Sequence, residues 1–282
     1  VTKLHSGAGY QYEDSVIYGF THTNKGHWNL CHIPLLPVTG TPTPGDYCSP
    51  FSHERESAAP GYYQVFLDRY GVDAQLSSTL RCAFHKYTYP AGAAPAVLAD
   101  LQRSNEHVRA WDIRKEGDNV FAGWQQTGEK MYFYAVANRP VTGIEPVVEG
   151  DREVRIVRFG EGDGALELRI GFSFVSEKNA RENFEAEMLG KSFAEVRSEA
   201  TATWNDLLGR IRVEGGTERE KGLFYSSLYR SFLWPALRSD VNGEFTDVDG
   251  KVINPGFRYY TGPSYWDDYR NKLILLGMLA PD

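Results

Sequence analysis

The period of the apolar residues changes near residue 175, and this change limits what the 282-residue chain can fold into. Before it, short runs of aromatic and β-branched residues, such as 62–67 and 130–136, are separated by glycines and prolines. Many short strands punctuated in this way predict an antiparallel β-sandwich. After it, apolar residues recur every three or four positions, as on the buried face of a helix. We therefore predict a β-domain over 1–175, followed by helices.

Helix start and stop signals divide the second part. Ser176 is placed to cap a helix over 177–189, and the segments 192–195 (Ser-Phe-Ala-Glu) and 217–220 (Thr-Glu-Arg-Glu) have the form of a capping box. The last of these helices must stop before Pro235, because proline lacks the N–H that a helix interior needs. These signals predict a helical linker over 176–214 and the beginning of an α-domain over 215–282.

Two turns and one more helix are expected before the chain ends. Asn242-Gly243 and Asp249-Gly250 favour type I′ hairpin turns. The turn interpretation also outweighs a calcium loop of the EF-hand type, which requires further oxygen ligands and a helix on each side. A last helix is predicted to begin near Trp266 and to continue through Leu276.

Composition excludes several classes of partner. The net charge is -7, and both signs are scattered along the chain, so a nucleic-acid partner is not expected. No apolar stretch approaches the ~20 residues of a membrane span. The chain opens on polar sequence without a signal peptide, which fits an intracellular protein or numbering that begins after processing. Cys31, Cys48 and Cys82 allow one disulfide or none, and they do not decide the compartment.

The segment 265–270 (Tyr-Trp-Asp-Asp-Tyr-Arg) combines the groups that bind a sugar. An aromatic ring covers the C–H face of a pyranose, and a carboxylate and a guanidinium hydrogen-bond its hydroxyls. We therefore assign substrate contact to Trp266, Asp267 and Arg270, although a helix start with a core tryptophan would also explain them. Asp268 fits that structural role near the helix dipole. Only 12 residues follow Arg270, so we expect this segment to belong to a longer protein.

Six stretches in a fixed order carry a resemblance to a known family. They are Gly19–Thr23 (Gly-Phe-Thr-His-Thr), 51–63, 84–90, 176–181, 224–229 and 264–270 (Ser-Tyr-Trp-Asp-Asp-Tyr-Arg). Together they resemble glycoside hydrolase family 92, the calcium-dependent exo-acting α-mannosidases. The resemblance implies a β-sandwich packed on an (α/α)6 barrel, with the active site between them and with only the first helices of the barrel in this chain.

The family resemblance also implies a chemistry. Family members invert the anomeric centre, which needs a general acid and a separate general base, and Ca²⁺ binds hydroxyls of the mannose. The acid, the base and most calcium ligands are expected beyond residue 282, so no residue here is named as catalytic or as a metal ligand. The implied substrate is a terminal α-mannose on a glycan or mannan. The implied location is secreted or periplasmic, and the implied partner is the remainder of the barrel.

The N-terminal motif and the loop behind it supply the other predicted substrate contacts. We place Phe20 and His22 in the mannose pocket. The loop 24–32 (Asn-Lys-Gly-His-Trp-Asn-Leu-Cys-His) departs from the family's usual sequence, and it is expected to border the active site. His27 and Trp28 are therefore candidate substrate contacts. Because Lys25, His27 and His32 would suit a phosphate, a mannosyl-phosphodiester hydrolase is an alternative function.

Other readings remain open at this point. A zinc site from His22, His27, Cys31 and His32 matches no common ligand spacing. Glu54 and Glu56 are expected to be structural or on the surface, His85 and Tyr87 interior, and Trp204 part of the core. Trp124 is a candidate for the domain interface. From another class, a lectin-like β-sandwich module without its own chemistry is an alternative function, although the helices argue against it.

Overall fold

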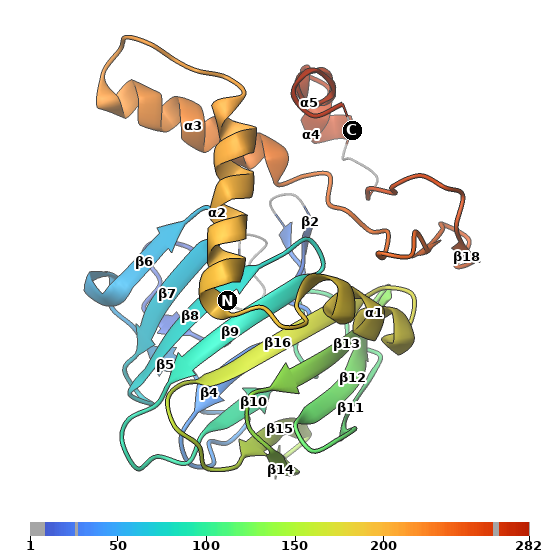
Figure 1. The fold of residues 1–282 in the computed structure, drawn as a ribbon. Helices are drawn as coiled ribbons and strands as arrows, with labels where there is room; N and C mark the ends of the chain where they lie inside the picture. Colours follow the sequence, from blue (N-terminus) through green and yellow to red (C-terminus); the bar gives the residue numbers. More distant parts are fainter. Residues whose placement is uncertain (1–8, 26–27, 262–264, 282) are drawn as a thin grey trace.

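Two antiparallel β-sheets form most of the computed structural model, which describes residues 9–25, 28–261 and 265–281 (Figure 1). The larger sheet has the strand order β11-β12-β13-β16-β9-β8-β7-β6, and the smaller one has the order β14-β15-β10-β4. The strands of the larger sheet are β6 (Glu56–Ala59), β7 (Tyr62–Leu67), β8 (Val72–Ser78), β9 (Cys82–Thr88), β11 (Ala110–Lys115), β12 (Val120–Gln126), β13 (Lys130–Ala137) and β16 (Leu166–Ser173). Those of the smaller sheet are β4 (Leu35–Val38), β10 (Ala96–Ala99), β14 (Val141–Glu149) and β15 (Arg152–Phe159). The predicted sandwich is confirmed.

The main core lies between these sheets. Strand β13 shows why, since its buried and half-buried residues alternate along its whole length. Strands β15 and β16 follow each other in the sequence but belong to different sheets, so the glycine-rich turn at 160–164 carries the chain across the core. Short two-stranded pairs complete the β structure. They are β1 (Val16–Ile17) with β5 (Ser49–Pro50), β2 (Asn24–Lys25) with β3 (Trp28–Asn29), and β17 (Phe245–Thr246) with β18 (Val252–Ile253); one 3-10 turn covers His53–Arg55.

Two helices pack on the outer face of the larger sheet. Ser176 caps α1 (Glu177–Glu187), as predicted, and α1 lies over β13 and β16. The approach is close, because a Cβ at Gly171 of β16 would lie 2.2 Å from the carbonyl oxygen of Ala180. The predicted capping box at Ser192 opens α2 (Phe193–Gly209), whose first turn buries Phe193 against the sheet. Farther along, α2 passes the turn between β6 and β7, where a Cβ at Gly61 would lie 2.7 Å from that of Ala200, and its last turns extend beyond the sheet (Figure 1).

The predicted second capping box is also present, at Thr217, where α3 (Glu218–Phe232) begins. It meets α2 at the end far from the sheet, and the rings of Trp204 and Tyr229 lie 4.6 Å apart there. Trp204 is half-buried in this contact between helices, so the prediction that it belongs to the core was wrong. As expected, α3 ends before Pro235.

Two local predictions were wrong. The last helix is broken into α4 (Tyr265–Asp268) and α5 (Lys272–Leu279), because Asn271 takes a left-handed conformation with φ 68°. The two turns are not type I′, which needs positive φ at both central residues. Only the glycines have it, with φ 86° at Gly243 and 78° at Gly250. Asp240 and Asp247 each accept a hydrogen bond from the glycine, as in longer hairpin loops that place Gly in the left-handed region.

Two further findings bear on the sequence analysis. No helix among the described residues is both long and apolar enough to cross a membrane. None of the three cysteines forms a disulfide with another described residue, and Cys31 and Cys82 are buried.

Candidate functional site

A cavity of about 600 Å³ lies at the end of the larger sheet that faces α3, and we call it the seam cavity. One wall comes from the segment Phe20–Thr23, the turn between β8 and β9, and the end of β16. The opposite wall comes from Tyr229 of α3 and from the segment Ala236–Asp240 that follows this helix. The cavity therefore lies where the helical part of the chain returns to the sandwich.

Two of the predicted substrate contacts, Phe20 and His22, lie together in this wall. Phe20 is 6% exposed and stacks on Tyr87, with the ring centroids 6.3 Å apart. His22 packs its ring 4.5 Å from that of Phe172. The apolar ring of Phe20 and the polar ring of His22 offer the two kinds of contact that a sugar needs. Their contact with substrate stays a prediction.

His22 is half-buried and contacts a pair of buried polar side chains. Its Nε2 lies 3.2 Å from Nε2 of His85, whose Nδ1 lies 2.6 Å from the hydroxyl of Tyr87. His85 and Tyr87 are buried, as predicted. Burial lowers the pKa of His22 to about 4 and that of His85 well below its usual range, because a charged imidazole loses its hydration. Both rings are therefore neutral near pH 7.

The opposite wall contributes a cation. The guanidinium of Arg238 lies 3.6 Å from the ring centroid of Phe174 and pairs with Glu129 at 2.9 Å. Burial lowers the pKa of Arg238 from its usual value, although Glu129 opposes this effect. Its Nη1 is buried and finds no hydrogen-bond partner among the described residues. Arg238 is therefore held in place by Phe174 and Glu129, and its Nη1 group makes no hydrogen bond to a described residue.

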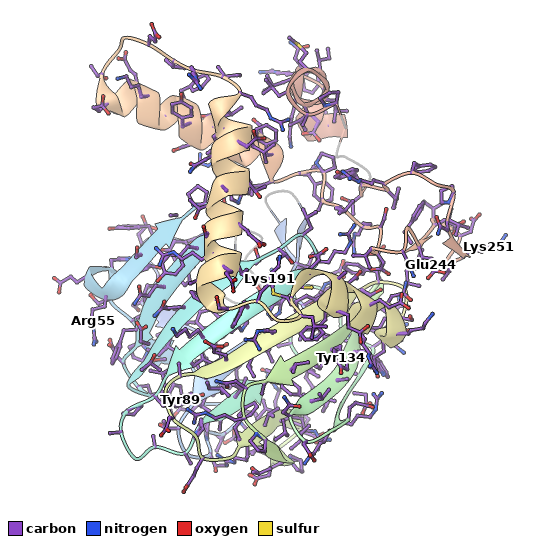
Figure 2. All side chains as sticks on the ribbon, viewed as in Figure 1. Arg55, Tyr89, Tyr134, Lys191, Glu244 and Lys251 are labelled. Carbon is purple, nitrogen blue, oxygen red and sulfur yellow. The ribbon has the colours of Figure 1, made fainter. Side chains whose placement is uncertain are left out.

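A buried carboxylate holds this wall against the sandwich. Asp240 accepts hydrogen bonds from the side chains of Ser173 at 2.7 Å, Asn179 at 2.9 Å and Asn183 at 2.7 Å. Burial raises the pKa of Asp240, while these donors oppose the rise. Asn179 also donates to Glu244, which is labelled beside α1 in Figure 2. The segment after α3 is thus tied to β16 and α1.

Arg81 fastens the same segment from the turn between β8 and β9. Its Nε donates to the carbonyl oxygen of Ser239 at 2.7 Å, and its Nη1 pairs with Glu187 of α1 at 2.7 Å. Both side chains of this ion pair are mostly buried. The seam cavity is therefore walled by groups that are held by the sandwich itself.

The structure contradicts part of what was predicted for the loop 24–32. His32 does not face a ligand, because it is 1% exposed and its ring nitrogens contact Thr23 at 2.8 Å and Thr127 at 3.0 Å. His32 also lies 3.6 Å from the carboxylate of Glu106, and this contact is the main reason why the pKa of Glu106 falls to about 2. The suggestion that His32 suits a phosphate was therefore wrong. His27, and the side chains of Lys25 and Trp28, lie outside the described residues.

Two of the predicted contacts near the end of the chain, Trp266 and Arg270, are not in the wall of the seam cavity. Trp266 of α4 is 87% exposed. Arg270 is exposed as well, and its Nε donates to the hydroxyl of Tyr269 at 2.6 Å. The side chain of Asp267 lies outside the described residues. Asp268 is buried and pairs with Lys272 at 3.1 Å, so it serves an ion pair within the helix ends.

Within the described ranges, no group of three or more His, Cys, Asp or Glu side chains is arranged to hold a metal ion. The ring of His22 contacts the ring of His85, whereas the ring nitrogens of His32 contact Thr23 and Thr127, so the rings of these two members of the candidate zinc set do not share a ligand site. Glu56, which was expected to be structural, accepts hydrogen bonds from Tyr10 and Tyr63 and contacts His53. Trp124 lies under the ammonium group of Lys130, at 3.5 Å.

Comparison with known proteins decides the family. Residues 2–181 match the glycosyl hydrolase family 92 N-terminal domain, and residues 179–282 match the glycosyl hydrolase family 92 catalytic domain. The chain belongs to glycosyl hydrolase family 92.

Solved structures of family 92 share the fold. An α-mannosidase from Bacteroides thetaiotaomicron is 25% identical and superposes with a TM-score of 0.89 over 97% of this chain and 42% of its own. The family 92 glycosyl hydrolase ccman5 is 28% identical, with a TM-score of 0.88 over 98% of this chain and 42% of its own. An uncharacterized secreted glycosidase of Arthroderma benhamiae is 24% identical over 84% of this chain and 37% of its own length. The chain thus spans about two fifths of these relatives.

Three residues of this family 92 cavity were missed from the sequence. Arg81, Arg238 and Asp240 lie in turns or irregular segments, where no period indicates which side chains point inward. Asp240 was interpreted only as part of a turn. Their partners are 57 to more than 100 residues away, as in the pairs Asn183–Asp240 and Arg81–Glu187. No local pattern could have identified them.

Proposed function

We propose that this chain is part of a glycosidase that releases terminal mannose from α-mannosides of glycans or mannan. The observation that carries the proposal is the superposition of 97% of the chain on a family 92 α-mannosidase. A second structure of that relative is in complex with mannoimidazole. The likeness to a secreted glycosidase supports a secreted or periplasmic location.

In this proposal, the described residues bind and orient the sugar. Phe20 offers an apolar ring for the C–H face of the mannose, and His22 adds an uncharged ring whose Nε2 is already in contact with His85. Arg238 adds a guanidinium to the wall of the seam cavity, and its position is fixed by Glu129 and Phe174. Trp266, Asp267 and Arg270 would meet the same sugar from the helical side.

The acid and base are proposed to lie outside the described residues. Inversion needs one carboxyl group to protonate the leaving oxygen and another to activate a water. Asp240 is a poor candidate for either role, because its two oxygens already accept three side-chain hydrogen bonds. Glu56 is engaged by two tyrosines and by His53.

Calcium dependence is part of the proposal, with a limit that the residues set. The described part of the chain offers no cluster of carboxylates that fits Ca²⁺, so it provides no step through the metal. Any Ca²⁺ would have to be held by other residues. A bound Ca²⁺ would take hydroxyl oxygens of the sugar as ligands and so help to orient it.

The test uses the full-length protein that contains this segment. We expect it to release mannose from α-mannobiosides, to give the inverted anomer by NMR, and to lose activity with EDTA and regain it with added Ca²⁺. Absence of mannose release from all α-linked mannobiosides would contradict the proposed function. Full activity in EDTA would contradict only the calcium dependence.

A second candidate is hydrolysis of mannosyl phosphodiesters. The unusual loop 24–32 follows Thr23, which lines the seam cavity, and Arg238 lines the same cavity. A guanidinium matches the geometry of a phosphate. Release of mannose from a mannose-1-phosphate diester, without release from mannobiosides, would favour this function. Mannose binding by the 282-residue segment alone would favour a lectin-like module.

A further inference from the structure

Three side chains connect the core of the sandwich to the wall of the seam cavity. Tyr87 contacts Nδ1 of His85, and Nε2 of His85 contacts Nε2 of His22. Tyr87 is 0% exposed and His85 is 2% exposed. A hydroxyl and a neutral imidazole can each donate and accept, so the two distances alone leave the direction of the hydrogen bonds open. The other partners of these groups decide it.

Tyr87 sets the direction at the buried end. Burial raises the pKa of its phenol well above the usual value, so the hydroxyl carries its proton. Within the part of the chain that the structure describes, this hydroxyl has one hydrogen-bond partner, Nδ1 of His85. A buried O–H without an acceptor would lose its hydration and gain nothing. Tyr87 therefore donates to His85.

The order of the other protons follows. His85 is neutral and has a single N–H, which must be on Nε2 because Nδ1 accepts from Tyr87. This N–H donates to Nε2 of His22. His22 is also neutral, so its own N–H is on Nδ1. Tyr87 then donates to His85 and His85 donates to His22, so both hydrogen bonds run in one direction, from the core toward the cavity wall.

His22, the last of these three side chains, lies beside a constrained segment of backbone. The carbonyl groups of Ile33 and His32 lie beside the His22 ring, although Nδ1 makes no hydrogen bond of normal geometry to a described residue. Cys31 and Ile33 both have left-handed backbone, with φ 56° and 51°. This is rare for a β-branched residue and is found where surrounding contacts enforce it. Gln125 supplies such a contact, since it accepts from the N–H of Ile33 at 2.8 Å.

We propose that Tyr87 and His85 are positioning residues, which hold His22 in the wall of the seam cavity as its Nδ1–H tautomer. Nε2 of His22 is then occupied, and the ring is fixed in its contact with Phe172. Any effect of these residues on the hydrolysis of an α-mannoside rests on the proposed function, whereas the tautomer of His22 can be measured independently of it.

Tyr87→Phe in the full-length protein tests the proposal, and Tyr89→Phe is the matched control. Tyr89 lies just beyond β9, and its hydroxyl donates to the carbonyl oxygen of Ala96 at 2.5 Å. Each variant removes one phenolic hydroxyl and one hydrogen bond, but only Tyr87 connects to His22. Correlation spectra of ¹⁵N-labelled histidine distinguish the two tautomers, and the signals of His22 and His85 are identified by their loss in His22→Gln and His85→Gln.

We expect Nδ1–H on His22 and Nε2–H on His85 in the wild type. Tyr87→Phe should shift both toward a mixture and lower kcat/KM for an α-mannoside by about tenfold, since His22 no longer has a fixed orientation. Tyr89→Phe should leave the tautomers unchanged and lower kcat/KM by less than about twofold. His22 as Nε2–H in the wild type would overturn the proposal, and so would equal spectra and kinetics of the two variants.

A second variant covers failure of Tyr87→Phe to fold. In His85→Gln the amide can still donate to Nε2 of His22, so Nδ1–H should persist, whereas His85→Leu removes that donor. Equal His22 spectra in these two variants would overturn the proposal. If the wild-type protein hydrolyses no α-mannoside, the proposed function fails, but the tautomers still decide this inference.

Discussion

The sandwich and the helices after it bury their apolar side chains to very different extents. In the sandwich, large residues such as Phe133 and Phe121 are 0% exposed. In α3 and α5, Leu223 is 60% exposed, Ile274 63% and Met278 75%. The sheets bury each other, whereas these helices contact few neighbours within the described chain. The sandwich therefore forms a complete core, and the helical part presents apolar surface.

The same difference separates the two groups of predicted substrate contacts. Phe20 and His22 belong to a wall that is fixed by buried hydrogen bonds and stacked rings. Trp266 lies on the short helix α4 and Arg270 in the turn between α4 and α5, and both side chains are exposed. One half of the proposed sugar site is thus preorganised by the sandwich. The other half depends on how the helices pack in the full-length protein.

The largest expected effect tests the contrast in burial. Phe133→Ala should reduce the free energy of unfolding by about 3–5 kcal/mol, because it opens a cavity in the closed core. Leu223→Ala in the same 282-residue segment should cost less than about 0.5 kcal/mol, because this side chain is already in water. Denaturant unfolding of both variants measures the difference. Similar losses would mean that the two regions do not differ in this way.

The next largest expected effect is a loss of folding stability in acid, which comes from His22 in the wall of the sandwich. The folded pKa of His22 is about 4, below the 6.5 of an unperturbed histidine, so the unfolded chain binds more protons between these values. The stability is complete above pH 6.5 and declines as the pH falls toward 4, by about 3 kcal/mol for a shift of this size. Thermal unfolding across this range should show a shallower decline for His22→Gln. An identical pH dependence would contradict the neutral state of His22.

The helical half of the site is tested by Asp267→Ala in the full-length enzyme. We expect kcat/KM to fall by more than ~100-fold, or about 2.7 kcal/mol, because a charged hydrogen bond that strengthens in the transition state is lost. Asp163→Ala, at the exposed turn between β15 and β16, is the control and should stay within about twofold. A fall of less than threefold in Asp267→Ala would remove this residue from the site.

The smallest effect compares two helix caps. Ser192 and Thr217 make the same capping box, but α2 starts against the sheet and α3 starts in solvent. Ser192→Ala should cost about 1 kcal/mol, as a lost cap usually does. Thr217→Ala should cost less in the 282-residue segment, because fraying of the first turn of α3 exposes no core. A larger loss at Thr217 would show that α3 is as tightly integrated as α2.

Local sequence signals were reliable where both partners of an interaction lie within a few residues of each other. Ser176, Ser192 and Thr217 cap the helices that they were predicted to cap, since each partner lies three residues away. Local patterns failed to predict the structure where the neighbouring residues in the sequence did not decide the backbone conformation. Asn271 breaks the last helix, and the glycine turns took a wider form than type I′.

The sequence by itself determined the order of strands and helices, the caps, and the residues that carry the family resemblance, because these depend on neighbours along the chain. Only the tertiary structure decided which polar groups meet in the seam cavity. His22 and His85 are 63 residues apart, and Asn183 and Asp240 are 57 apart. Such contacts form only after two sheets and a returning segment have packed together, since closure of long loops and burial of the core fix them jointly.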